Sequence, residues 1–366
     1  KASVRKKASG DWLGTITHTS TTNDLVRDFV IPSTAEKMCA YMDIMPGGCY
    51  DPETLVSHWW GAKFYDDLVC IVQDATGLKG FNVDEVLSYK EMEELEMMLP
   101  EGALNKTYWM CIFAVNQHIS ICGVCFDCQI YDNTDARFCR GCHQKLHNPC
   151  RCGSQKYLSG HDLCQMDKFD AVMQGIPSLL VALDRQLITL TRVWVVSEIG
   201  KSLATKKRIE WQTAGIDRSI ILNTWRPTSI QDCQATNPAD KAMIMKQILD
   251  SVGYDAFDLA VAEAVMPIVS TFGMHLCVRD DTLGVPLQRL IDDGGDVNAV
   301  VGSFGRGLLF EAAGHNNPEA VTILVTAGVQ TDFVDKEGTS PVFIAAQFGH
   351  EQVVRCLVEA RADVQQ

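Results

Sequence analysis

Short apolar runs alternate with segments of helical spacing between about residues 53 and 275, and this alternation is typical of α/β folds. Three of the apolar runs have the character of buried strands: 55–56, 108–115 and 178–183. Helical spacing follows them at 64–72, at 166–173 and from about residue 190. The pattern therefore predicts a parallel sheet whose strands are joined by helices.

The segments around this region carry weaker patterns. Residues 1–52 look irregular and are expected to form an N-terminal arm that wraps the α/β domain. An acidic amphipathic helix is predicted at 84–98 and is interpreted as a solvated face. Two more helices are predicted at 238–249 and 256–269, the second of them packing against the C-terminal part of the chain.

The C-terminal part repeats itself with a period of 33 residues. Gly338 and the pair Ala345–Ala346 follow Gly305 and the pair Ala312–Ala313 at this distance, and a weaker third copy begins at Pro286. A 33-residue unit with glycine in its turns and small residues where two helices cross resembles an ankyrin repeat.

The resemblance predicts an α-helical ankyrin solenoid over residues 281–366. Two roles stay open for it. Ankyrin arrays bind protein partners through a concave surface, but three units could also serve only to cap the neighbouring domain.

Length and charge narrow the classes of function. A chain of 366 residues is long enough for two or three domains. Its net charge of -14 repels phosphate backbones, so nucleic acid is not expected as a partner. The basic run Lys1–Lys7 is interpreted as a solvated tail. No stretch approaches the roughly 18 apolar residues that are needed to span a bilayer, so no transmembrane segment is predicted. A targeting peptide that has been removed is left open as an alternative.

Cysteines are concentrated in the middle of the chain. Eight of the 15 lie between Cys122 and Cys164, in close pairs beside histidines, and this clustering inside a large chain favours metal over disulfides. The remaining cysteines are scattered singly and read as buried thiols. The protein is therefore expected in a reducing, intracellular compartment, most simply the cytoplasm.

Pairs of thiolate or imidazole ligands two residues apart can bind one tetrahedral Zn²⁺. The predicted zinc ligands form four such pairs: Cys125, Cys128, Cys139, Cys142, His147, Cys150, His161 and Cys164. Their spacing resembles MYND and related treble-clef fingers, with one or two zinc ions. A single site formed by the first two pairs is the simpler alternative, and Cys122, His143 and Cys152 are spare candidates.

All the positions around each proposed zinc ion are protein ligands, which leaves no open position for a catalytic water. The zinc is therefore expected to be structural. A zinc finger for protein or peptide recognition is the alternative.

Two motifs with tryptophans lie in the α/β region. The first is S-H-W-W-G at the end of a predicted strand, residues 57–61, and the second is an R-x-W helix with a glutamate, residues 192–198. Both resemble the divergent TIR-like domains of protists, which are often joined to ankyrin repeats. The resemblance implies a flavodoxin-like TIR fold over residues 53–275, with the cysteine-rich segment 119–165 as an insertion.

In enzymatic TIR domains a helix glutamate cleaves the nicotinamide–ribose bond of NAD⁺. The resemblance makes Glu198 the candidate catalytic residue, because a carboxylate near the ribose can stabilise oxocarbenium-like charge. The implied substrate-binding residues come from both motifs: Ser57, His58, Trp59, Trp60, Arg192 and Trp194.

The same residues also have structural interpretations. Trp194 could belong to a core, and Glu198 could pair with Arg192 or Lys201. Many TIR-like domains are signalling scaffolds that self-associate without turnover. Two functions therefore stay open: a protein-interaction, assembly or signalling protein with TIR-like and ankyrin modules, or an NAD⁺ glycohydrolase that uses Glu198.

Overall fold

The computed structural model describes residues 16–45, 51–77, 102–120, 122, 141, 155, 169–301 and 305–362. The helix predicted at 84–98 and the eight predicted zinc ligands lie outside these residues. The basic run Lys1–Lys7, the spare candidates His143 and Cys152, and most of the segment 119–165 lie outside them as well.

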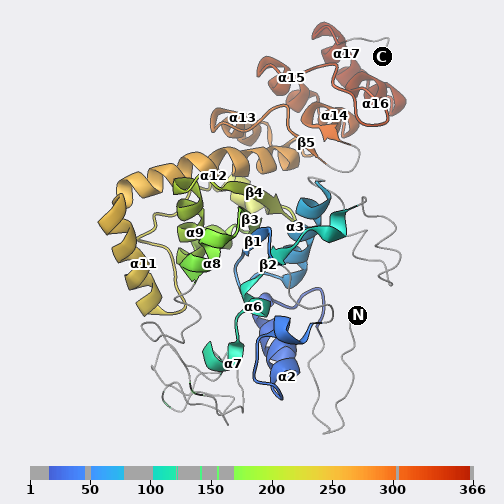
Figure 1. Cartoon of the computed structure of the whole chain (residues 1–366). Coiled ribbons are helices and arrows are strands. Elements are labelled where there is room, and N and C mark those ends of the chain that lie inside the picture. The colour runs from blue at the N-terminus through green and yellow to red at the C-terminus, as the bar shows by residue number, and fades with distance from the viewer. Residues whose placement is uncertain are drawn as a thin grey trace.

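A parallel sheet of four strands forms the centre of the first half of the molecule, in the order β2-β1-β3-β4 (Figure 1). Its strands are β1 (Thr54–Ser57), β2 (Tyr108–Trp109), β3 (Ser178–Leu183) and β4 (Arg208–Thr213). The predicted parallel α/β sheet is therefore confirmed. β4 was not predicted, because its sequence of Arg, Glu and Gln among apolar residues is too polar to read as a buried strand.

The strand predicted at 108–115 is wrong beyond Trp109. The chain turns there into a short helix, α6 (Cys111–Ala114), in which the Ala114 amide donates to the Met110 carbonyl. Among the described strands, β2 pairs only with β1, so a longer extended strand would leave one row of backbone groups without partners. A helical turn satisfies those groups locally and still buries Ile112 completely.

Side chains of β3, one of the two inner strands, alternate between two cores. Leu179, Val181 and Leu183 belong to one core, and Leu180 and Ala182 belong to the other. The first core contains α8 (Phe169–Gly175) and α9 (Val193–Ala204), backed by α12 (Tyr254–Cys277), and the second contains α3 (Phe64–Thr76) and the N-terminal helices. Both faces of the sheet are thus covered, as a parallel sheet requires.

The N-terminal region is helical from residue 22 to residue 34, although it was predicted to be irregular. Its helical segments are α1 (Thr22–Leu25), a π-helical turn (Val26–Val30) and α2 (Ile31–Thr34), followed by a 3₁₀ turn (Tyr41–Ile44). Thr21 and Asp24 form a capping box at the start. Val26 and Val30 are completely buried, so tertiary packing stabilises this helical segment.

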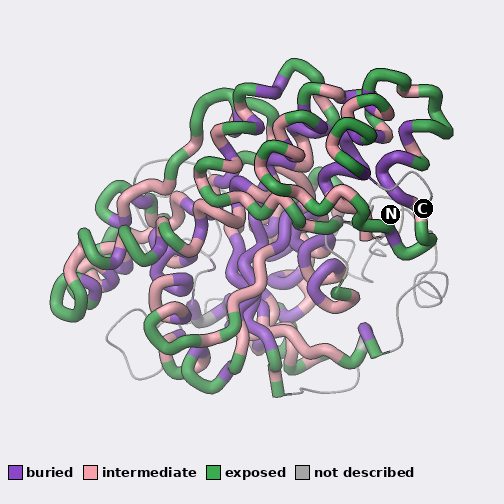
Figure 2. Tube along the Cα trace, turned by 90° about the horizontal axis from the view of Figure 1, so that it is seen from above, coloured by how far each residue is buried: buried purple, intermediate pink, exposed green. Residues whose placement is uncertain are grey.

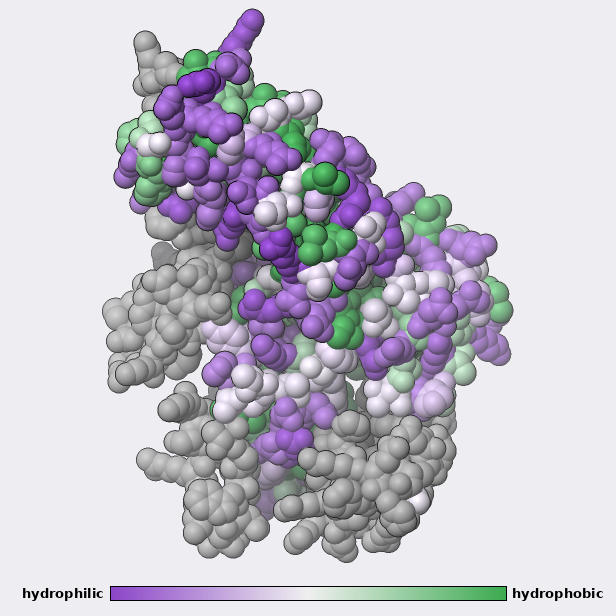
Figure 3. All heavy atoms as spheres, turned by 180° about the vertical axis from the view of Figure 1, so that it is seen from behind, coloured by the Kyte–Doolittle hydropathy of each residue, from purple (hydrophilic) through white to green (hydrophobic). Residues whose placement is uncertain are grey.

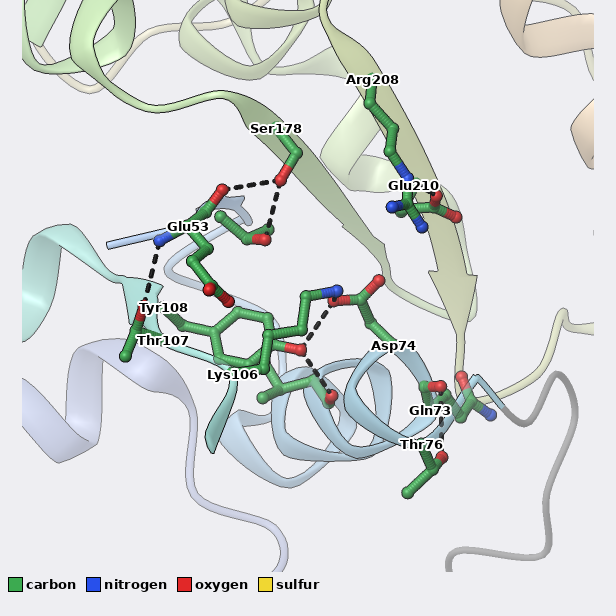
Figure 4. Close-up of polar contacts among 12 residues, drawn as sticks. Glu53, Gln73, Asp74, Thr76, Lys106, Thr107, Tyr108, Ser178, Arg208 and Glu210 are labelled. Carbon is green, nitrogen blue, oxygen red and sulfur yellow. Dashed lines mark hydrogen bonds and ion pairs between the residues drawn. The ribbon is translucent and has the colours of Figure 1, made fainter. Parts of the chain in front are cut away.

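The amino ends of the strands are fastened by a polar network (Figure 4). The Ser178 hydroxyl donates to the Glu53 carbonyl and bonds to Thr54, at 2.7 and 2.8 Å. Nearby, the carboxylate of Asp74 accepts from the Lys106 ammonium and the Tyr108 hydroxyl, at 2.6 and 2.7 Å. These groups satisfy one another, and in open α/β sheets ligand sites lie at the opposite edge, where the strands end.

Helix α12 joins the α/β domain to the C-terminal array and follows α11 (Pro238–Ser251). Phe257, Val261 and Val265, at four-residue spacing, lie in the core of the α/β domain, whereas Met274 and Cys277 lie in the core of the array. In the described part of the chain, α12 is the one helix long and apolar enough to cross a membrane, a segment that the sequence analysis did not expect. Its buried residues in two cores give it a role as a core helix.

The C-terminal region is a stack of helix pairs (Figures 1 and 2). Its further elements are α13 (Gly284–Asp292), β5 (Val300–Val301), β6 (Arg306–Gly307), α14 (Leu308–Gly314), α15 (Pro318–Thr326), α16 (Pro341–Gln347) and α17 (Glu351–Glu359). The end of α12 packs on α13 as the first pair of the stack. Ala312 and Ala345 are completely buried between neighbouring helices, where their small size allows close packing as predicted.

Short elements connect these parts. They are a 3₁₀ turn (Ala103–Asn105), α7 (Gln117–Ser120), a second 3₁₀ turn (Ile188–Thr191) and α10 (Arg218–Leu222). The last one matters for the whole molecule, because Ile221 of α10 is buried in the core of the C-terminal array.

Candidate functional site

Ser57 and Glu198 meet at the carboxyl edge of the sheet. Ser57 is the last residue of β1, and the alternation along the strand turns it to the same face as Leu55, toward α9. Its hydroxyl donates a hydrogen bond to Oε2 of Glu198, which lies in the second turn of α9. β1 and β3 are central neighbours whose crossovers leave in opposite directions, so the pair lies near the switch point where α/β folds bind ligands.

The Glu198 carboxyl is held in a buried environment. The residue is only 6% exposed, and burial raises the pKa of the carboxyl to about 7. The Ser57 hydrogen bond and the positive charge of Lys201 lower this pKa, while the negative charge of Asp170 raises it, but burial dominates. A carboxyl of this kind exchanges its proton near neutral pH, which is a property of catalytic acids and bases.

Arg192 and Trp194 face a different part of the molecule from Glu198. The Arg192 guanidinium donates to Gln234 and Thr236, at 3.1 and 3.3 Å. The Trp194 indole donates to Asp240 of α11 at 3.3 Å. Although these residues are close to Glu198 in sequence, these hydrogen bonds tie the start of α9 to α11 and the segment before it and do not reach the Ser57–Glu198 pair.

Within the S-H-W-W-G segment, the side chains are mostly used for packing. His58 is buried, and its Nδ1 lies 3.3 Å from the Val56 carbonyl, while Nε2 has no hydrogen-bond partner among the residues that the structure describes. Burial lowers the pKa of His58 to about 4, so the imidazole is neutral at neutral pH. Trp60 donates to the Cys111 sulfur at 3.3 Å, and the ring of Trp59 covers Gly61 so closely that no Cβ would fit there.

Three carboxylates at this edge of the sheet are additional to the predicted site residues. Asp66 and Asp67 open α3, and Asp184 follows β3. Asp67 accepts from the Thr22 hydroxyl at 2.6 Å, and burial raises its pKa well above the usual range. Asp184 could have been chosen as a candidate site residue from the sequence, because it directly follows an apolar strand. In the described ranges no three such ligands converge in a way that could hold a metal ion.

The second candidate site is a groove in the C-terminal array. A hollow of about 140 Å³ lies between the turn that precedes α14 and the corresponding turn of the next unit. Its apolar lining comes from Val297, Leu308, Phe310, Val329 and Phe333. We call this hollow the repeat groove; a concave binding surface of the array was one of two roles left open from the sequence, and none of these residues was assigned to it.

The floor of the repeat groove is fixed by charged and polar contacts. The Arg306 guanidinium lies over the Phe310 ring, 5.0 Å from its centroid, and pairs with Asp335 at 3.7 Å. The Asn298 side-chain oxygen accepts a hydrogen bond from the backbone N–H of Gln330 at 2.9 Å, so the turns of two successive units are tied together. The groove is therefore formed in the free protein.

Comparison with known protein families identifies ankyrin repeats, in three copies, at residues 274–366. The predicted solenoid is thereby confirmed, and the matched range starts at residue 274, within α12. A search of characterised proteins finds no match to the chain. The C-terminal quarter of this protein is thus an ankyrin-repeat domain.

Proposed function

We propose that this protein is an interaction and assembly protein that holds a protein partner on its ankyrin repeats. The repeat groove carries the proposal, because it is apolar, open to solvent and formed before binding. Seen from behind, most of the described surface is hydrophilic and its apolar areas are small and separate (Figure 3). Apolar hollows with polar edges on such a surface mark binding sites.

Site-specific photo-cross-linking tests this role. A photoreactive residue replaces Gln330, which lines the groove, and a matched control replaces the exposed Gln352 on the outer helix α17. In extract from the source cells, we expect discrete cross-linked products from position 330 and none of the same products from position 352. Identical products from both positions would contradict a partner in the groove.

We propose further that the first domain is TIR-like and acts in signalling, and that bound zinc stabilises the fold of the segment 119–165. The parallel sheet with both faces covered supports the fold proposal. The zinc proposal rests on the spacing of the cysteines and histidines, which lie outside the described residues. Metal analysis of the purified chain, compared with a Cys125→Ser/Cys128→Ser variant, should show one or two zinc ions that decrease in the variant.

An NAD⁺-cleaving activity is the second candidate function. It is supported by a buried carboxyl with a raised pKa, bonded to Ser57 at the carboxyl edge of the sheet. The test is NAD⁺ consumption by zinc-loaded protein at high concentration, with Glu198→Gln as the control. Turnover that disappears in the variant would support the enzyme, and absence of turnover in the parent protein would leave the interaction role.

We place the protein in a reducing, intracellular compartment. The described part of the chain contains seven cysteines without disulfides, and Cys70, Cys122, Cys233 and Cys277 among them are buried. Alkylation of cell lysate under denaturing conditions, with and without prior reduction, should label the same number of thiols.

A further inference from the structure

The repeat groove has the size of one large apolar side chain. Its volume of about 140 Å³ is close to that of an apolar cavity of about 150 Å³, which is large enough to hold benzene. Phe333 on one side is 38% exposed and Phe310 at the floor is buried, so a ring or branched chain placed between them would be desolvated. Apolar anchors in such pockets contribute most of the affinity of protein interfaces.

The ankyrin array is acidic as a whole. Residues 281–362 contain eleven acidic and five basic residues. Three of the five basic side chains already have partners: Arg289 bonds to Thr224, Arg306 pairs with Asp335, and Arg355 pairs with Glu351. The array therefore presents an excess of negative charge to an incoming chain.

Two exposed acids are the sequence neighbours of residues that line the groove. Asp296 precedes the lining residue Val297, and Asp332 precedes the lining residue Phe333. The two acids come from the turns of successive ankyrin units, so each belongs to a segment that also lines the hollow. Positive charges that flank an apolar anchor would match this arrangement.

We infer that the partner segment is basic, with one phenylalanine- or leucine-sized side chain inserted in the repeat groove between lysines or arginines. This inference rests on the proposed function and adds the chemistry of the partner. The occupant is a segment of another protein chain, because the groove offers apolar walls for a side chain and exposed polar groups of Asn298 and Gln330 beside them. Since the two turns are already tied together, little ordering accompanies binding.

A designed peptide serves as the probe, because the partner is unidentified. The fluorescent peptide Lys-Lys-Ser-Phe-Ser-Lys-Lys is titrated with the full chain, beside one control with alanine for phenylalanine and another with glutamate for every lysine. We expect saturable binding of the first peptide only. Its affinity should fall when the salt concentration rises from about 50 to about 500 mM, because exposed charges are screened.

Variants locate the site. Phe333→Ala removes one wall and Val297→Phe fills the hollow, and each should weaken binding about tenfold or more. Asp296→Asn should weaken binding less and reduce its salt dependence. Val285→Ala, on the outer helix α13 and 83% exposed, is the matched control and should bind like the parent chain. Circular dichroism verifies that each variant is folded. If Phe333→Ala does not fold, Val297→Phe still tests the site.

The outcomes separate the inference from the proposed function. Equal binding of the phenylalanine and alanine peptides, or unchanged binding by Val297→Phe, would overturn the inferred anchor. Preference for the glutamate peptide would overturn the inferred charge. In either case, specific cross-linking from position 330 that the basic peptide does not displace would still support partner binding and would require a partner of different chemistry.

Discussion

Substitution of Glu198 by glutamine should make the α/β domain more stable at alkaline pH. In the folded chain, burial raises the pKa of this carboxyl from an ordinary 4.5 to about 7. An acid with a raised pKa binds its proton more tightly in the folded state than in the unfolded state. Between these two pKa values the unfolded chain loses the proton first, so stability falls as pH rises from about 4.5 through 7.

The size of the effect follows from the shift. Each pKa unit corresponds to about 1.4 kcal/mol, so the 2.5-unit difference amounts to about 3 kcal/mol of stability lost at pH 8 relative to pH 4. Glutamine keeps an oxygen that can accept from the Ser57 hydroxyl but carries no charge at any pH. The variant should therefore match the parent protein at pH 5 to within about 1 kcal/mol and exceed it by about 2 to 3 kcal/mol at pH 8.

Tryptophan fluorescence during urea unfolding is a suitable assay. All seven tryptophans of the chain lie between residues 12 and 225, so their fluorescence follows the first domain and not the ankyrin helices. Glu263→Gln, at an exposed position of α12, is the matched control and should keep the pH dependence of the parent protein. If Glu198→Gln and the parent chain show the same pH dependence of the unfolding midpoint, the assignment of a protonated buried carboxyl is refuted.

Three further substitutions test the packing around α12. Gly200→Ala places a methyl group inside the contact distance of the Phe257 ring, and should lower stability by about 1 to 3 kcal/mol in urea unfolding; an unchanged midpoint would mean that α9 and α12 lie farther apart. Ser270→Ala removes a buried hydroxyl that has no partner among the described residues, so thermal unfolding should show an equal or higher Tm, and a clear decrease would disprove the lack of a partner. Arg226→Ala breaks a two-bond contact with Asp293, but the arginine is half exposed, so the cost should stay below about 1 kcal/mol and vanish in high salt.

The ankyrin domain was predictable because its signal is periodic and local. Gly305 and Gly338 both have positive φ, where glycine is favoured, and Ala312, Ala313 and Ala345 are completely buried at the helix contacts, whereas Ala346 is exposed. Strands β1 and β3 were predictable because they are apolar on both faces. Strand β4 and the end of β2 were not, since their structure depends on which neighbour supplies hydrogen bonds and not on their own pattern.

The candidate sites show the same division. The strand-end position and the helix motif led to Ser57 and Glu198, and the fold brings these two residues into contact. The motif spacing did not reveal that Arg192 and Trp194 turn toward Gln234 and Asp240, because these partners lie 42 and 46 residues further along the chain. The repeat groove escaped detection for a similar reason: its walls come from turns of two units, and only their stacking creates the hollow.

The ankyrin array and the first domain cannot be regarded as independent modules on a flexible linker. Helix α12 contributes to both cores, and Ile221 of α10 enters the ankyrin core beside Gly273, where a Cβ would lie 2.6 Å from its Cδ1. Repeat arrays require a cap at the end of the stack, and α10 with its contacts to the first unit supplies one here. A partner bound in the repeat groove would therefore be held at a fixed position relative to the carboxyl edge of the sheet, which is the geometry that an assembly protein requires.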